Sequence, residues 1–295
     1  MRVLVTGAGG QIGHELVERA PAFGVEATGL GHAALDVADA GAVRRAIGSV
    51  EPDVVINAAA YTAVDRAETE PEVAFAINRD GVAALASACA AHGIPLIHFS
   101  TDYVFDGTKR TPYTEDDPPN PLGVYGRSKW EGEEAVRAVL DRHVILRTAW
   151  VFAGHGHNFV RTMLRLARER EVLRVVADQE GCPTPARGAA EAALTIARQL
   201  AEPPARWGTY HVAGTPPTTW HRFAEAIAAE ARRHGPLVAT HVEPITTADY
   251  PTPAPRPAYA VLDTRRTARA FGLTPPAWRE ALPEVVAALL AGGRP

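Results

Sequence analysis

Residues 2–13, RVLVTGAGGQIG, decide the fold. The opening run Arg2–Thr6 is short, aliphatic and rich in valine, which predicts a buried strand. It leads into Gly7, Gly10 and Gly13 and then into a helical pattern. A strand, a glycine turn and a helix form the context in which helix N–H groups and the positive end of the helix dipole bind a pyrophosphate.

The glycine spacing fits one phosphate-binding pattern and not another. Read as G-x-G-x-x-G, the match fails, because Ile12 stands where the last glycine should be. Read as G-x-x-G-x-x-G, it is complete. The alternative is a glycine-rich turn without a ligand, and the regular strand and helix on either side argue against it.

Strand-like runs alternate with helical runs through residue 150. The strands are predicted at Glu26–Leu30, Asp53–Asn57, Pro95–Ser100 and Val144–Thr148. The helices are predicted at 39–50, 73–92 and 125–140. This alternation predicts an α/β fold with a Rossmann-like, doubly wound parallel sheet, whose carboxyl edge binds ligands. We expect a dinucleotide-binding domain over residues 1–150, rejoined by a helix at 187–200, and a smaller, mainly substrate-binding α/β domain over 151–295.

A tyrosine and a lysine form the candidate catalytic pair. Tyr125 and Lys129 are four residues apart, on one face of a helix. A lysine cation beside a phenol is expected to lower the pKa of the tyrosine toward neutrality, so that it can protonate a carbonyl. Thr101, at the end of a predicted strand, could bind the same carbonyl. Such a pair also arises by chance, and its value comes from sharing a sheet edge with the glycine turn.

The cofactor is expected to be NADPH or NADH, and the sequence leaves the choice open. The second strand ends at Leu30-Gly31-His32, without the acid typical of NAD sites or the arginine typical of NADP sites. Asp36 could reach the adenine side, and a loop or helix-cap role is an equal alternative. The small residues Ala58–Ala60 would let a cofactor lie against the backbone.

Composition excludes several other classes of function. The net charge of −4, with 46% hydrophobic and 22% charged residues, predicts no strong attraction to nucleic acid or anionic membranes. No signal pattern and no membrane-spanning run is expected, which favours a cytoplasmic protein. Cys89 is read as a core residue and Cys182 as an incidental loop residue, and no spacing indicates a metal site.

Three residues outside the catalytic pair have open interpretations. Trp150 follows a strand on the ligand side, where it could stack on a base or sugar or pack in the core. His98 lies within a strand and is read as a packed histidine. Arg256 is a candidate for the pyrophosphate of a substrate because its planar fork suits phosphate, with a surface arginine as the alternative.

These motifs resemble the extended short-chain dehydrogenase/reductases and, among them, the dTDP-4-dehydrorhamnose reductase family. The matching segments cover nearly the whole chain. They are Gly7–Gly13, Asn57–Asp65, Ser100–Gly107, Val124–Lys129, Arg147–Phe152, Asn158–Phe159, Asp178–Thr184 and Tyr250–Pro257. The later segments make the resemblance specific to this reductase family.

The resemblance implies two sets of binding residues. The cofactor would be bound by Gly7, Gly10, Gln11, Ile12, Asp36, Val37, Ala58, Ala59, Ala60, Tyr61, Thr62, Phe99, Tyr125 and Lys129. The substrate would be bound by Thr101, Asp102, Tyr103, Trp150 and Asn158, to which Arg256 is added on its chemistry.

The resemblance also implies the reaction: hydride reduction of the C4 carbonyl of dTDP-4-dehydro-L-rhamnose, with Tyr125 as proton donor. Some family members are thought to dimerise through a metal held by acids. Here Glu15 is present, but Arg187 stands near another expected acid, so we predict no metal and leave a homodimer open. The alternatives are a reductase or epimerase of another nucleotide-linked deoxysugar, and a non-catalytic nucleotide-binding regulator.

Overall fold

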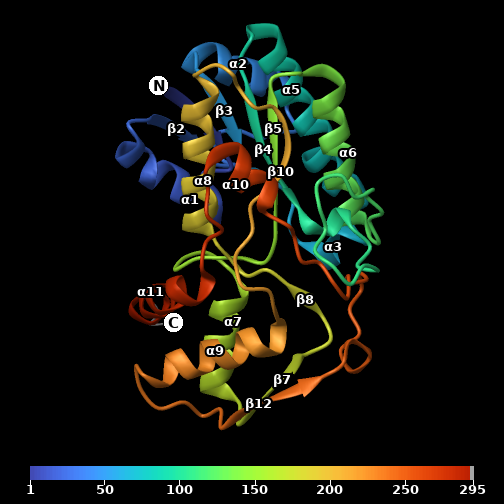
Figure 1. Cartoon of the computed structure of the whole chain (residues 1–295), viewed down its shortest axis with the longest axis vertical. Helices are drawn as coiled ribbons and strands as arrows, with labels where there is room; N and C mark the ends of the chain where they lie inside the picture. Colours follow the sequence, from blue (N-terminus) through green and yellow to red (C-terminus); the bar gives the residue numbers. More distant parts are fainter. Residues whose placement is uncertain (293–295) are drawn as a thin grey trace.

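Six parallel strands form the central sheet of the computed structural model, which describes residues 1–292. Their order is β10-β5-β4-β3-β1-β2 (Figure 1). The strands span Arg2–Thr6 (β1), Glu26–Leu30 (β2), Val54–Asn57 (β3), Leu96–Thr101 (β4), His143–Thr148 (β5) and Gly208–His211 (β10). The predicted Rossmann-like α/β class is therefore confirmed. β2 lies on one side of β1, and β3 and the later strands lie on the other, so the order of the strands reverses between β1 and β3. Open α/β sheets bind ligands at such a point.

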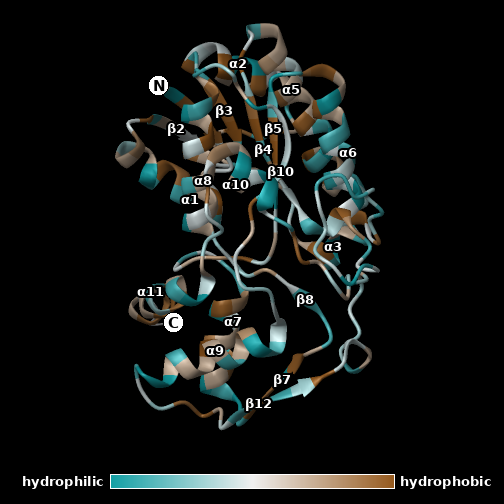
Figure 2. Ribbon diagram, in the orientation of Figure 1, coloured by the Kyte–Doolittle hydropathy of each residue, from teal (hydrophilic) through white to brown (hydrophobic). Residues whose placement is uncertain are grey.

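Alternation within β1 divides the core between the two faces of the sheet. Val3 and Val5 pack toward one helical layer and Leu4 toward the other. The first layer contains α1 (Gln11–Arg19) and α8 (Ala186–Leu200). The second contains α2 (Ala40–Val50), α5 (Gly81–His92) and α6 (Val124–Val139). Because both faces are covered, the central strands are continuously apolar, as the brown strands in Figure 2 show.

A smaller body, which we call the C-terminal unit, lies at the other end of the molecule (Figure 1). It consists of α7 (Phe159–Glu169), α9 (Trp220–Arg232), α11 (Trp278–Ala291) and the parallel pair β7 (Val172–Val176) and β12 (His241–Ile245). Its core is one apolar cluster centred on Phe223 and Trp278. The chain returns from this unit to the sheet through α8, β10 and α10 (Arg265–Phe271), so residues beyond 150 contribute to both bodies.

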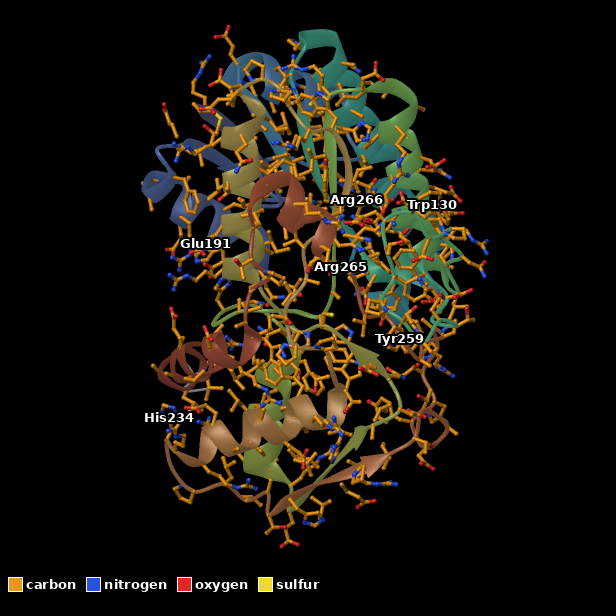
Figure 3. All side chains as sticks on the ribbon, viewed as in Figure 1. Trp130, Glu191, His234, Tyr259, Arg265 and Arg266 are labelled. Carbon is orange, nitrogen blue, oxygen red and sulfur yellow. The ribbon has the colours of Figure 1, made fainter. Side chains whose placement is uncertain are left out.

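Several short elements complete the fold. They are the strands β6 (Val151–Phe152), β8 (Glu180–Gly181), β9 (Thr184–Pro185) and β11 (Thr218–Thr219), the helix α3 (Val64–Ala67) and the single turns η1 (Ala20–Phe23), η3 (Asp102–Val104) and η4 (Thr247–Asp249). β6 pairs with β9 and β8 with β11. Tyr259, which bridges to Glu180, lies between the bodies (Figure 3).

The predicted helix at 73–92 has an irregular middle. It begins as α4 (Pro71–Phe75), widens into a π-helical turn η2 (Ala76–Asp80) and continues as α5. By length and composition alone, the run Pro71–His92 is apolar enough to cross a membrane, which differs from our expectation that no run is long enough. The run lies against α2 and α6 in the layer that covers the sheet, and six residues of α5 are buried there.

Candidate active site

The glycine turn holds three elements close together. Gly7 has a φ of +71°, and a side chain there would strike the backbone of Ala58 and Ala59. A side chain at Gly13 would strike the carbonyl of Gly7. These two glycines are therefore required for the close approach of β1, α1 and the end of β3. Gly9, by contrast, faces open space.

The start of α1 offers free backbone donors. Its N-cap, Gly10, supplies no side-chain oxygen, so no cap engages the amides that the helix itself leaves unpaired. Gln11 and Ile12 begin the helix with such amides. A backbone that a ligand can approach and uncapped donors fit the pyrophosphate of a dinucleotide.

Asn78 ties the loop after β3 to α6, and sequence reasoning missed it. Its Oδ1 accepts from the N–H of Tyr61 at 2.9 Å, and its Nδ2 donates to the Tyr61 carbonyl and to Ser128 Oγ, both at 3.0 Å. Asn78 belongs to the π-helical turn, a distortion that often marks functional sites. The only signal in the sequence was an amide within an alanine-rich helical run, and the structure shows that this amide is fully buried.

Thr101 and Tyr125 meet at the carboxyl edge of the sheet. The Thr101 hydroxyl donates to Asp102 Oδ1 at 3.0 Å and accepts from the N–H of Tyr103 at 3.2 Å. The same hydroxyl acts to lower the pKa of the Tyr125 phenol. Burial nevertheless raises the pKa of Tyr125 to about 12.

Burial also makes Asp102 an unusual acid. It raises the pKa of the Asp102 carboxyl to about 7, against the hydrogen bond from Thr101. Its Oδ2 is buried without a hydrogen-bond partner. An unpaired buried oxygen next to the threonine fits a site that is completed by a polar ligand.

Lys129 is buried and does not act on Tyr125 as we expected. Its Nζ donates to the Phe99 carbonyl at 2.7 Å, and burial lowers its pKa to about 8, opposed by the charge of Glu133. Lys129 is not among the groups that shift the pKa of Tyr125. The predicted lowering of the tyrosine pKa by a lysine cation is therefore wrong. Burial disfavours both charged forms, the ammonium of Lys129 and the phenolate of Tyr125.

A buried ion pair anchors α6 to the sheet, and it too was missed from the sequence. Glu133, fully buried on α6, accepts two hydrogen bonds from Arg147 at 2.9 and 2.7 Å, one from Arg137 at 2.7 Å and one from Ser100 at 2.5 Å. Trp130, labelled in Figure 3, lies against both guanidinium groups. The bonds join α6 to β4 and β5 and so set where Lys129 enters the site.

The adenosine side is less specific. Asp36 is exposed and accepts from the N–H of Ala38 at 3.0 Å, while the true cap of α2 is Asp39. Val37 and Phe99 are both buried in the core. The predicted cofactor contacts of these residues and of Thr62, which is exposed, stay predictions.

Trp150 combines backbone strain with aromatic stacking. Its φ of +47° is rare for a bulky residue and is typical of positions held by their surroundings. Its indole stacks on Trp220 of α9, with 3.5 Å between ring centroids and 9° between planes. A side chain at Gly181 would strike the same indole. Core packing therefore accounts for much of its surface, and sugar stacking stays a prediction.

Asn158 joins the C-terminal unit to the glycine turn. Its Oδ1 caps α7, and its Nδ2 donates to Gln11 Oε1 at 3.0 Å and to the Ala153 carbonyl at 2.9 Å. Gln11 Nε2 in turn donates to the Val151 carbonyl. These bonds position the turn, and a substrate contact by Asn158 stays a prediction.

Arg256 reaches the site through Tyr103. Its guanidinium pairs with Asp65 at 2.8 Å and lies 5.9 Å from the centre of the Tyr103 ring. The Tyr103 ring lies against Tyr125, with 5.5 Å between centroids. This places a half-buried cation next to the ring that packs against Tyr125, although its fork already donates to Asp65 and to the Ala254 carbonyl.

Neither cysteine is exposed, and Arg187 pairs with two acids. Cys89 lies in the core as predicted, and Cys182 is also buried, so it is not an incidental loop residue. Arg187 pairs with Glu191 at 3.0 Å and Glu284 at 3.2 Å. Within residues 1–292, no three potential ligands lie close enough together to hold a metal ion.

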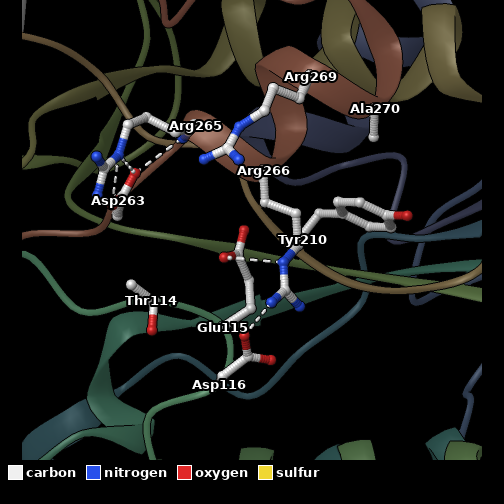
Figure 4. A pocket seen from close by; sticks show the side chains of 9 residues that line it. All are labelled: Thr114, Glu115, Asp116, Tyr210, Asp263, Arg265, Arg266, Arg269 and Ala270. Atoms are coloured by element: carbon white, nitrogen blue, oxygen red, sulfur yellow. Dashed lines mark hydrogen bonds and ion pairs between the residues drawn. The ribbon is translucent and has the colours of Figure 1, made fainter.

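A charged hollow of about 470 Å³ lies beside the edge strand β10 (Figure 4). Figure 4 shows arginines of α10 facing acids of the 109–122 loop, with Arg266 paired to Glu115 and Asp116. None of the predicted site residues is among those that line it. The opposite charges neutralise one another, so this hollow has no evident ligand.

The fold and the site define a class of protein. A parallel sheet with a glycine turn, joined at its carboxyl edge by a threonine, a tyrosine and a lysine, is the arrangement of an extended short-chain dehydrogenase/reductase. Residues 1–291 match the family described as RmlD substrate binding domain. The chain belongs to this dTDP-4-dehydrorhamnose reductase family.

Individual relatives agree over their full lengths. A dTDP-4-dehydrorhamnose reductase from Sinorhizobium fredii is 46% identical over 297 residues, covering 100% of this chain and 99% of that protein. The crystal structure of one from Clostridium acetobutylicum has a TM-score of 0.90 at 36% identity, with 98% and 100% covered. One from Bacillus anthracis, in complex with NADP, has a TM-score of 0.89 at 34% identity, with 97% and 98% covered.

Proposed function

We propose that this chain reduces the C4 keto group of dTDP-4-dehydro-L-rhamnose to give dTDP-L-rhamnose. The observation that carries the proposal is the meeting of Thr101, Tyr125 and Lys129 at the sheet edge that also holds the glycine turn. Relatives that share the whole length of the chain bear the name of this reductase. One of them is in complex with NADP, which supports an NAD(P)H-dependent reaction.

The chain's own residues would hold the cofactor at both ends. The amides of Gln11 and Ile12 would bind the pyrophosphate, and Lys129 Nζ, already held by the Phe99 carbonyl, would bind the nicotinamide ribose. Ala58–Ala60 would lie along the cofactor. When bound, a reduced nicotinamide supplies the hydride that the reaction needs.

Tyr125 and Thr101 would manage the charge that develops on the carbonyl oxygen. Because the Tyr125 pKa is raised to about 12, its phenol carries a proton throughout the neutral range and can donate it. The Thr101 hydroxyl would hold the oxygen from another side. Asp102, Tyr103, Trp150, Asn158 and Arg256 are proposed to hold the dTDP-sugar.

The test follows the reduced-nicotinamide absorbance with dTDP-4-dehydro-L-rhamnose, with NADPH and NADH run side by side. We expect oxidation of the cofactor and dTDP-L-rhamnose as the product by NMR. A different product sugar would keep the chemistry and change the substrate. No oxidation with either cofactor, despite measurable cofactor binding, would contradict the proposal and favour a regulatory role. We further infer action in the cytoplasm, and light scattering would test for a homodimer.

A further inference from the structure

A chain of buried polar side chains runs from β1 through β3 to β4 and ends at the catalytic lysine. Thr6 Oγ1 donates to Asn57 Oδ1 over 2.6 Å, and Asn57 Nδ2 lies 2.9 Å from His98 Nδ1. On the other side of the ring, His98 Nε2 lies 3.5 Å from Lys129 Nζ. Thr6, Asn57 and His98 are completely buried, so each must find its partners within the protein.

The backbone sets the direction of this chain. The N–H of Ala59, which can only donate, lies 3.0 Å from Asn57 Oδ1, so that atom is the amide oxygen. Asn57 Nδ2 is then a donor, and His98 Nδ1 must accept from it. Burial, which is the largest cause, holds the pKa of His98 well below its usual value. The ring is therefore neutral and carries its single proton on Nε2, the atom that faces the lysine.

Two donors facing each other have a chemical consequence. An ammonium has three N–H groups and no lone pair, so it cannot accept the His98 Nε2–H, whereas a neutral amine can. Either form can donate to the Phe99 carbonyl. We propose that His98 is a positioning residue that presents an N–H to Lys129 and thereby favours the neutral amine over the ammonium at this site.

The charged groups around the lysine do not cancel this preference. Glu133, one turn further along α6, favours the ammonium, but its carboxylate is already held by Arg147 and Arg137. Tyr125, one turn earlier, remains a neutral phenol in the neutral pH range because of its raised pKa. The remaining neighbours are on β4, where the Phe99 carbonyl accepts and the histidine donates.

The sequence provides an unusually clean experiment. Only two lysines occur in the chain, Lys109 and Lys129. Protein labelled with lysine carrying carbon-13 at the ε position would therefore give two side-chain signals, which can be followed by NMR from neutral to alkaline pH. Lys109, on a partly exposed loop, is the internal reference.

His98→Leu removes the donor and approximately keeps the volume. We expect the pKa of Lys129 to be about 8 in the original protein and to rise by about 1 in the variant. His211→Leu, which removes an equally buried histidine from the same sheet, should leave it unchanged. An unaltered Lys129 pKa in folded His98→Leu, or an equal rise in both variants, would overturn the proposal.

Asn57→Asp provides a second test if His98→Leu fails to fold. The aspartate has the same shape but offers His98 Nδ1 an acceptor, so the ring proton should move to Nδ1 and leave the Nε2 lone pair facing Lys129. The nitrogen-15 shifts of His98 should show the exchange of tautomers, and the Lys129 pKa should rise. A histidine that keeps its tautomer, or a lysine pKa that does not rise when the tautomer changes, would contradict the proposal. These titrations need no turnover, so they can fail while the proposed function stands, and the reverse also holds.

Discussion

The central sheet and the C-terminal unit are stabilised by different chemistry. Beneath α6 the sheet buries ions and amides, with Glu133 and Arg147 as a paired charge and Asn57 and His98 as a directed hydrogen-bonded chain. The core of the C-terminal unit is apolar and aromatic, with Phe223 packed edge-on against Trp278. Buried polar groups need particular partners, whereas apolar cores accept exchanges of similar volume. Removing a polar partner in the first region should therefore have a large effect, on chemistry or on stability, whereas an apolar exchange of similar volume in the second should have a small one.

The largest effect is expected from Tyr125→Phe. The ring that packs against Tyr103 remains, so the variant should fold and bind cofactor normally, but it has no proton to donate. We expect kcat to fall by about 10²–10⁴-fold. Steady-state turnover and cofactor Kd are the measurements. Turnover near the original rate would show that Tyr125 is not the proton donor.

Glu133→Ala tests the buried charges directly. It leaves the buried Arg147 without its partner, which should lower the free energy of unfolding by about 3–5 kcal/mol. Glu134→Ala, an exposed neighbour on the same helix, should cost less than about 1 kcal/mol. Urea titration measures both free energies of unfolding. Similar losses in the two variants would mean that the buried pair contributes no more to stability than an exposed pair.

Lys129→Met separates the charge of the lysine from its packing. The folded-state pKa of about 8 lies below the ordinary 10.5, so between these values the unfolded chain binds more protons and the lysine makes stability rise with pH. Between about pH 8 and pH 10.5, the free energy of unfolding of the original protein should rise relative to that of the variant by up to about 1.4 kcal/mol per pH unit. Unfolding at several alkaline pH values measures this, with Lys109→Met as control. The variant should also lose turnover and cofactor affinity, and an unchanged cofactor Kd would contradict the ribose contact.

The smallest effect is expected in the C-terminal unit. Phe223→Leu keeps an apolar side chain within the cluster, so the free energy of unfolding should fall by only about 1–2 kcal/mol, with kcat unchanged within about twofold. A large loss of turnover with little loss of stability would show that this core also takes part in chemistry, and the contrast between the regions would fail.

The sequence was sufficient for the parts of the molecule that depend on periodicity and local turns. Local geometry could be predicted in three places. They are the valine-rich strand β1, the turn with Gly7 and Gly13, and the helix face shared by Tyr125 and Lys129. The cap of α2 is also a local feature, but a cap role was considered for Asp36, and the structure assigns it to Asp39.

Partnerships between distant residues could not be predicted in this way. The carboxyl of Glu133 and the guanidinium of Arg147 are separated by a helix and a strand, and nothing local indicates that both are buried. The same is true of the link from Asn57 to His98. The pKa of Tyr125 was misjudged for a related reason: burial acts on both members of the Tyr125/Lys129 pair, and only the folded structure shows its extent.

The stacked indoles of Trp150 and Trp220 give the molecule an optical property of its own. Trp150 lies two residues beyond the end of β5 and Trp220 begins α9 of the C-terminal unit, so the stack connects the two bodies. Two chromophores in such close contact share their excited state, and their combined circular dichroism depends on how they are oriented. Any rotation of one body against the other on ligand binding would change that signal without an added label.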